Sequence, residues 1–492
     1  MKTEKLSSNY IYSLIYRASI CLLPLIVTPY LTRVLSEENN GLYVFTSTVA
    51  CFFIMFCKLG LESYGNRCIA VCRDDPEKRS KEFLSIFGLQ LISSAISIGS
   101  YIIFVLFFVN ESKTIYWIQF LYILTGLFDV SWFFYGMEKF RLTTIRSLLS
   151  RGLIVAGIFV FVKKAEDVLP YTLVMSACFL LEQLILFAFL PKYVKLTKIS
   201  LSDVFAHLKP NLTLFVPILA FNIYHWVDKL MLGIICQKED VAYYNYAESI
   251  ISLPKGILQA LGAVLMPRIA YLAAMNVKEK CRVMLKDSIE IISLLSCGMC
   301  FGILGVASVF VPFFLGEKYM QSVTLAMELA VVVIPMSLSD LIQNAYLVPF
   351  KKDKINMISV SIGAVVNIIF NSALIPFFGT SGAVIATLGA GTIVFVYLFR
   401  HIRSFLGARE FAESILPYIV IGLCEAAVAL LISRLGFSRP VLLVLQIAAA
   451  GGAYVILCVI YYLIRKKLDR SYIDPISRML SDMGSAEADK ND

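Results

Sequence analysis

The chain has 492 residues, of which 59% are hydrophobic and only 16% are charged, and its mean hydropathy is +0.78. Soluble proteins carry about 25% charged residues, so this composition excludes a soluble protein and indicates a polytopic membrane protein. The formal net charge of +9 would suit an anionic partner such as nucleic acid. The basic residues gather instead in loops between apolar segments, so we expect no nucleic-acid partner.

Apolar segments long enough to cross a membrane recur along the whole chain. A transmembrane helix needs about 20 apolar residues, and by this measure the sequence predicts about fourteen spans. The first six lie near residues 10–32, 41–63, 83–109, 115–136, 142–162 and 168–190. The next six lie near 212–235, 248–272, 288–314, 322–346, 356–376 and 381–400, and the last two near 412–433 and 441–464. The first segment is too long for a signal-peptide core and lacks a small-residue cleavage site, so it is interpreted as the first transmembrane helix.

An internal repeat groups these spans. The segment V-L-S-E-E-N-N-G-L-Y (34–43) matches I-I-C-Q-K-E-D-V-A-Y-Y (234–244), and the same number of residues separates Tyr43 from Arg67 as separates Tyr244 from Arg268. Each half holds six spans, so the repeats enter the membrane with the same orientation, as in transporters built from parallel repeats. The predicted fold is therefore all-α, with two six-helix lobes and two C-terminal helices. The predicted boundaries are 1–200, 201–410, 411–466 and, for a cytoplasmic tail, 467–492.

Loop charges predict the orientation. With a cytoplasmic N-terminus, the inner loops include the basic segments 67–81, 191–198, 278–282, 351–354 and 465–470. This asymmetry follows the positive-inside rule, so both termini are expected in the cytoplasm. The loops are short, which disfavours a membrane glycosyltransferase or polysaccharide polymerase, since these typically carry a long external loop or a soluble domain.

The cysteine and histidine residues do not indicate a redox or metal site. Most of the twelve cysteines lie in apolar segments, where cysteine behaves as a small hydrophobic residue. Cys297-Gly298-Met299-Cys300 has the C-x-x-C form, but it lies in a predicted span without a βαβ context. With three histidines in all, we expect no metal site.

The seventh predicted span carries an unusual set of polar residues. At 100° per residue, Asn211, Asn222, His225 and Lys229 lie on one helix face, while Asp228 points about 100° away, toward a neighbouring helix. A charge in the middle of a bilayer costs about 2.5 kcal/mol or more. The stripe is therefore expected to face a partner helix or a water-filled cavity, with Asp228 as a charge partner.

Other spans carry polar residues, each with a structural alternative. Lys58 and Glu62 are interpreted as an i, i+4 ion pair, and Asn367 and Asn371 as interhelical hydrogen-bonding residues. Arg146 and Asp340 lie near span ends, where snorkelling to the interface is the alternative. Glu425 lies outside the repeat and is expected to make a structural or partner contact. The predicted cavity residues are Arg17, Lys58, Arg146, Arg151, Asn222, His225, Lys229, Lys255 and Arg268, and the predicted coupling or charge-pair residues are Asp129, Glu182, Asp228 and Asp340.

Cations outnumber carboxylates in this set. A few uncompensated Lys or Arg side chains in a low-dielectric vestibule attract anions, and arginine is well shaped for phosphate. The sequence thus favours a phosphate or pyrophosphate cargo over an organic cation.

Five segments carry a resemblance to a known family. They are P-Y-L-T-R-V-L-S…G-L-Y (29–43), K-L-G-L-E-S-Y-G-N-R (58–67), W-F-F-Y-G-M-E-K-F (132–140), V-D-K-L-M-L-G (227–233) with Y-Y-N-Y-A (243–247), and L-M-P-R (265–268). In this order they resemble the Wzx-type oligosaccharide flippases, the polysaccharide-biosynthesis branch of the MATE-like multidrug/oligosaccharidyl-lipid/polysaccharide flippase superfamily.

The resemblance implies a function and a mechanism. Such flippases move undecaprenyl-pyrophosphate-linked oligosaccharide repeat units to the outer leaflet of the cell membrane by alternating access, for O-antigen, capsule or exopolysaccharide assembly. Relatives that flip the peptidoglycan precursor use cavity arginines on early spans of each lobe; Arg17 is the equivalent here, with Lys58 and Arg268 as further candidates. The implied partners are the lipid-linked cargo, membrane lipids and assembly proteins such as a polymerase.

The sequence contains no P-loop. We therefore expect no cofactor. We expect a H⁺ or Na⁺ gradient or the membrane potential to supply the energy for transport. A drug exporter of the same fold, a peptidoglycan-precursor flippase and, more distantly, a polymerase remain alternatives.

Overall fold

The computed structural model describes residues 2–275, 277–403, 405–468 and 474–475, except for some side chains of the first and eleventh helices. All regular elements in these ranges are helical. Contacts divide the chain into two units, Met1–Ala242 and Tyr243–Asp492, and each unit is described by itself.

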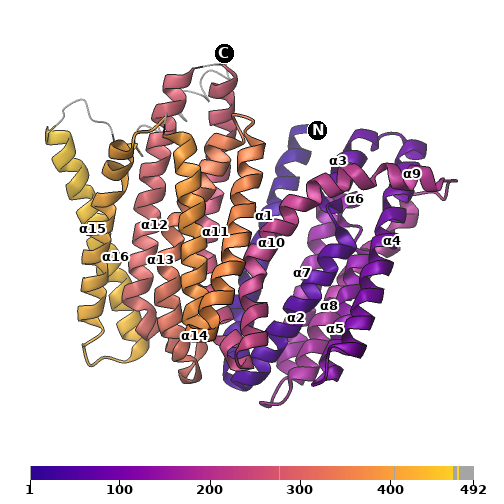
Figure 1. The fold of residues 1–492 in the computed structure, drawn as a ribbon, viewed down its shortest axis with the longest axis horizontal. Helices are drawn as coiled ribbons and strands as arrows, with labels where there is room; N and C mark the ends of the chain where they lie inside the picture. The colour runs from indigo at the N-terminus through magenta and orange to yellow at the C-terminus, as the bar shows by residue number, and fades with distance from the viewer. Residues whose placement is uncertain (1, 276, 404, 469–473, 476–492) are drawn as a thin grey trace. The chain divides into compact units, whose positions relative to one another are not determined.

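The first unit holds ten α-helices, drawn from indigo to magenta in Figure 1. They are α1 (Lys2–Val34), α2 (Glu37–Lys58), α3 (Leu61–Cys72), α4 (Pro76–Phe107), α5 (Lys113–Phe128), α6 (Ser131–Gly136), α7 (Phe140–Phe161), α8 (Val168–Phe189), α9 (Leu201–Ala206) and α10 (Leu208–Ile235). Helix α2 packs on α4 and α5, α8 packs on α5 and on the preceding helix α7, and α10 packs on α2.

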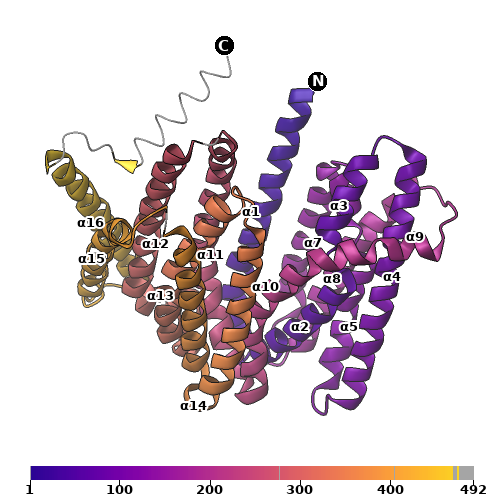
Figure 2. The ribbon, with the colours of Figure 1, turned by 45° about the horizontal axis from the view of Figure 1, so that its top comes forward.

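The second unit contains the remaining helices, including most of α11. They are α11 (Lys238–Ala274), α12 (Lys278–Leu315), α13 (Gln321–Ile342), α14 (Asp353–Ile402), α15 (Ala408–Ile432) and α16 (Arg439–Leu468). Helix α12 packs against α13, α15 and α16, and both views show α15 and α16 side by side (Figures 1 and 2).

The helices match the predicted spans closely. In the described part of the chain, 11 helices are long and apolar enough to cross a membrane. One of them, α14, covers both predicted spans 356–376 and 381–400, which a kink at Gly379 (φ 55°) separates. The spans predicted at 10–32 and 248–272 fall in α1 and α11, in which some side chains are not described. The all-α polytopic class is confirmed.

Two predicted spans are not continuous helices, and this is a correction. The span predicted at 41–63 breaks after Lys58, where Leu59 takes φ 48°. The span predicted at 115–136 breaks at Asp129, which takes an extended conformation between α5 and α6. Hydropathy alone does not register such breaks, because the apolar composition continues across them.

Aromatic packing holds the short helix α6 in the first unit. Trp132, Phe133 and Phe134 are fully buried, and Trp132 stacks on Phe83 of α4 with ring centroids 5.4 Å apart. Gly65 of α3 lets this indole approach, since a Cβ there would lie 2.5 Å from a Trp132 ring atom. This packing places the polar residues at the start of α6 against α4.

Helix α10 belongs to the same unit as the helices that precede it. The reason is local packing: Gly233 of α10 lies against the Phe45 ring of α2, and the rings of Phe52 and Trp226 meet edge to face at 5.3 Å. The predicted lobe boundary near residue 200 stays a prediction.

Candidate functional site

The candidate site lies in the first unit, where two helices break. Lys58 is the last residue of α2 and Asp129 directly follows α5, and their side chains form an ion pair. A lysine at a helix C-terminus also interacts favourably with the partial negative charge of the exposed carbonyls there. We name the group Lys58, Asp129, Arg146 and Glu182 the break cluster.

Helix α4 supplies the hydrogen bonds that the breaks remove. Gln90 Nε2 donates to the carbonyl oxygens of Gly126 at 2.8 Å and of Asp129 at 2.9 Å, and Ser93 Oγ donates to that of Cys57 at 2.7 Å. Trp132 Nε1 donates to Gln90 Oε1 at 3.1 Å. In a membrane, backbone groups freed by a helix break must find partners inside the protein. These contacts show that the breaks are built into the fold.

Replacing Gln90 by Leu tests that support. We expect the midpoint of thermal unfolding to fall by an amount equivalent to about 1–3 kcal/mol, because buried carbonyls lose their donor. Ser100→Leu is the matched control, since Ser100 is an exposed polar residue on the same helix. Equal midpoints for the two variants would show that Gln90 does not support the break.

Arg146 continues the cluster from α7. Its side chain is 4% exposed and donates to Ser131 Oγ at 2.8 Å, to Gln183 Oε1 at 2.8 Å and to the Glu182 carbonyl at 2.9 Å. The Glu182 carboxylate lies 3.8 Å from Arg146 Nε. Since Asp129 Oδ1 accepts from the Ser131 backbone N–H at 2.9 Å, a continuous set of contacts runs from Lys58 to Glu182.

One expectation from the sequence is wrong here, and one alternative is excluded. Lys58 pairs with Asp129, not with Glu62, because α2 ends at Lys58 and the i, i+4 geometry is lost. Arg146 does not snorkel to the interface, because it is buried among polar partners. The break cluster balances two cations with two carboxylates, so Lys58 and Arg146 would meet an anion only after these pairs open.

The residues of the predicted polar stripe on α10 differ in how deeply they are buried. Asn211 is fully buried against the backbone around Gly60, whereas His225 and Lys229 are half-buried. Asn222 Nδ2 lies 3.4 Å from the Met55 sulfur of α2. Asp228 is buried, as its predicted direction off the stripe implies. Its charge partner stays a prediction.

The other predicted site residues make contacts of their own. In α7, the Arg151 guanidinium lies 5.9 Å from the centre of the Tyr16 ring. In the second unit, Lys255 Nζ lies 3.3 Å from the Met336 sulfur, and Asp340 accepts from Gln259 Nε2 at 2.9 Å. The side chains of Arg17 and Arg268 lie outside the described residues.

Buried amides in α14 agree with a structural role. Asn371 Nδ2 donates to Asn367 Oδ1 at 3.1 Å, and Asn367 Nδ2 donates to Thr387 Oγ1 at 3.4 Å, across the kink at Gly379. The bond from Asn367 to Thr387 joins the two halves of α14, as interhelical hydrogen bonds between membrane helices do, and the bond from Asn371 lies within the first half.

Sequence reasoning missed the neutral members of the site, Gln90, Ser131 and Gln183. Each is an uncharged polar residue in an apolar segment, and its residue type by itself carries no information on its partner. The tripeptide Asp129-Val130-Ser131 was a usable signal, since Asp side chains cap a nearby backbone N–H and so favour a break in a helix.

Comparison with known proteins places the chain in a family. The sequence profile of the family described as "Polysaccharide biosynthesis protein" matches residues 6–273. The chain belongs to the polysaccharide biosynthesis protein family. The resemblance seen in the sequence is thereby confirmed.

Two proteins named as O-antigen transporters are similar to this family member. One from Escherichia coli (strain K12), named as an O-antigen transporter, is 28% identical over 351 residues, or 69% of this chain and 83% of that protein. One from Shigella dysenteriae with the same name is 22% identical over 390 residues, or 78% of this chain and 96% of that protein. Both names describe a transporter, which agrees with the prediction that the chain is not an enzyme.

Solved structures show the fold of this polysaccharide biosynthesis protein. The lipid II flippase MurJ in an inward closed conformation has a TM-score of 0.72 and 16% identity, covering 92% of this chain and 99% of that one. An inward-facing multidrug resistance MATE family transporter has a TM-score of 0.59 and 13% identity, covering 80% and 95%. The predicted MATE-like fold is confirmed.

Proposed function

We propose that this protein is a flippase that moves a lipid-linked oligosaccharide repeat unit to the outer leaflet for surface polysaccharide assembly. The observation that carries the proposal is the 28% identity, over most of both chains, to a protein named as an O-antigen transporter. The match to the polysaccharide biosynthesis family and the likeness in fold to a lipid II flippase support it.

The proposed mechanism is alternating access with an anionic cargo. The cargo's pyrophosphate would be attracted by Arg17, Lys229, Lys255 and Arg268, while Lys58 and Arg146 become available when the break cluster opens. Discontinuous helices commonly form ion and substrate sites in transporters, and the breaks after α2 and α5 supply such a place. When the break cluster opens, Lys58 and Arg146 would each exchange a carboxylate partner for a pyrophosphate oxygen. Each cation would therefore keep a negatively charged partner.

The same opening suggests how an ion could be coupled to transport. When Lys58 or Arg146 meets the cargo, Asp129 or Glu182 loses its partner and becomes a site for H⁺ or Na⁺. Asp228 and Asp340 are the further coupling candidates. We propose the inner membrane as the location, with both termini in the cytoplasm as the loop charges indicate, and a polysaccharide polymerase as a functional partner.

Deleting the gene and measuring lipid-linked repeat units tests the function. We expect these units to accumulate on the cytoplasmic face and surface polysaccharide to disappear, and both to recover on complementation. Lys229→Ala is expected to complement poorly, because a cation on the cargo path is lost. Lys198→Ala, an exposed loop lysine, is expected to complement fully.

Other outcomes identify the competing functions. Altered drug resistance with normal surface polysaccharide would assign a drug exporter. Accumulated peptidoglycan precursor with normal surface polysaccharide would assign the same activity as the lipid II flippase.

A further inference from the structure

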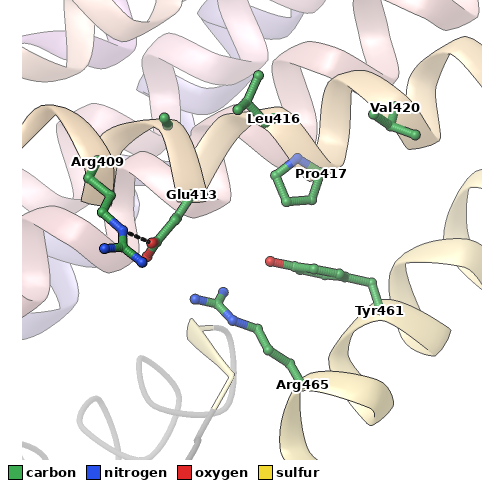
Figure 3. Close-up of a pocket in the computed structure, with 8 residues that line it drawn as sticks. Arg409, Glu413, Leu416, Pro417, Val420, Tyr461 and Arg465 are labelled. Carbon is green, nitrogen blue, oxygen red and sulfur yellow. Dashed lines mark hydrogen bonds and ion pairs between the residues drawn. The ribbon is translucent and has the colours of Figure 1, made fainter. Parts of the chain in front are cut away.

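A pocket with basic and apolar ends lies between α15 and α16 in the second unit. Its volume is about 680 Å³. Figure 3 shows Arg409, Glu413 and the Arg465 guanidinium near one end, the Tyr461 ring opposite Pro417, and Leu416 and Val420 further along α15. The pocket is separate from the break cluster, which belongs to the first unit.

Hydrogen bonds to buried residues hold the Arg465 side chain in position. Its Nη1 atom donates to Glu290 Oε1 at 3.1 Å, and that carboxylate also accepts from the Tyr418 hydroxyl at 3.0 Å. Tyr418 in turn lies 2.8 Å from the Tyr462 hydroxyl. Glu290 and Tyr418 are buried, while the Arg465 side chain remains 26% exposed. This anchoring lowers the conformational entropy that a ligand contact at Arg465 would cost.

Arg409 faces the same space from α15. It is 92% exposed and pairs with Glu413 Oε1 at 3.0 Å (Figure 3). Exposed pairs of this kind contribute about 0–1 kcal/mol, whereas charge-assisted bonds from arginine to phosphate are stronger. Arg409 is therefore able to exchange Glu413 for a phosphate oxygen. Exposed Lys466 and Lys467 follow Arg465 and add positive potential at this end.

The apolar part of the pocket begins about two turns into α15. At 1.5 Å per residue, Leu416 and Val420 lie about 10 and 16 Å along the helix from Arg409. Both side chains are exposed, on a helix that is apolar enough to cross a membrane. The pocket thus passes from charged to apolar over the distance that separates a lipid phosphate from its acyl chains.

We propose that this pocket binds an anionic phospholipid, with the headgroup phosphate between Arg409 and Arg465 and an acyl chain along Leu416 and Val420. Basic pockets between transmembrane helices bind anionic headgroups in this way. The site is independent of the proposed cargo function, because it requires only bilayer lipid.

Native mass spectrometry of the full-length protein with added phosphatidylglycerol or phosphatidylcholine tests the proposal. We expect preferential binding of phosphatidylglycerol, and about a fivefold weaker affinity for Arg409→Gln, as removal of one interfacial arginine implies. Arg465→Gln should weaken binding at least as much, and Arg465→Lys should retain most of it. Arg409→Gln is the decisive variant. The Arg409 side chain pairs with the partly exposed Glu413, so the variant is expected to keep the wild-type midpoint of thermal unfolding.

Lys467→Gln is the control for general surface charge, and its affinity should change less than twofold. Equal binding of the two lipids would overturn the proposed site. An equal loss of affinity for phosphatidylglycerol in Lys467→Gln and Arg409→Gln would also overturn it. Displacement of phosphatidylglycerol by millimolar inorganic phosphate or pyrophosphate would show a phosphate site without lipid selectivity and would overturn the phospholipid assignment.

Discussion

Replacing Asp129 by Leu is expected to destabilise the protein more than any other single change considered for the first unit. The substitution leaves Lys58 without the carboxylate that it contacts at the helix break. Removing one partner of a buried ion pair costs about 3–5 kcal/mol, and because the Lys58 side chain is 31% exposed we expect its part of the loss near the lower end of this range. The substitution also removes the acceptor of the buried Ser131 backbone N–H. The measurement is the midpoint of thermal unfolding of the purified protein, together with surface polysaccharide in complemented cells.

The double variant Lys58→Met, Asp129→Leu separates pairing from packing. Because apolar residues of similar volume often replace a buried ion pair without loss of stability, we expect the double variant to recover most of the lost midpoint. Surface polysaccharide should stay absent, since the proposed mechanism needs these charges. Asp74→Leu, which changes a fully exposed carboxylate, should leave both readouts unchanged.

Two results would contradict this interpretation. If the double variant is as unstable as Asp129→Leu, the two charges do not stabilise each other. If it restores surface polysaccharide, neither residue takes part in transport.

Replacing Arg146 by Lys is expected to lower stability although the charge is kept. The guanidinium reaches Ser131, Gln183 and the Glu182 carbonyl at once, and a lysine ammonium does not reproduce this planar fork. Losing one or two buried hydrogen bonds to a charged group corresponds to about 2–4 kcal/mol. The thermal midpoint should fall accordingly, and transport should fall with it.

The matched control is Arg141→Lys, on the same helix but exposed. Its midpoint should stay within experimental error of the wild type, because an exposed arginine makes little net contribution. A midpoint for Arg146→Lys that equals that of Arg141→Lys would show that the hydrogen bonds of Arg146 do not stabilise the first unit.

The candidate residues themselves could be recognised from the sequence, but their pairing could not. Lys58, Asp129, Arg146 and Glu182 stand out because a charge in an apolar span is costly and must be compensated. The sequence favoured Glu62 as the partner of Lys58, since it is the nearest carboxylate along an unbroken helix. The positive φ of Leu59 removes that neighbour, and packing of α2 on α5 brings in Asp129.

The sequence by itself determined the class of protein, the position of nearly every helix and the family. These follow from hydrophobic segment length and from short local motifs, which depend only on residues close together in the chain. The tertiary structure alone decided where helices break, which charges meet and which arginines share a pocket. Those features depend on contacts such as Gln90 with the end of α5 and Glu290 with Arg465, where the cost of a buried polar group is met by a residue far away in sequence.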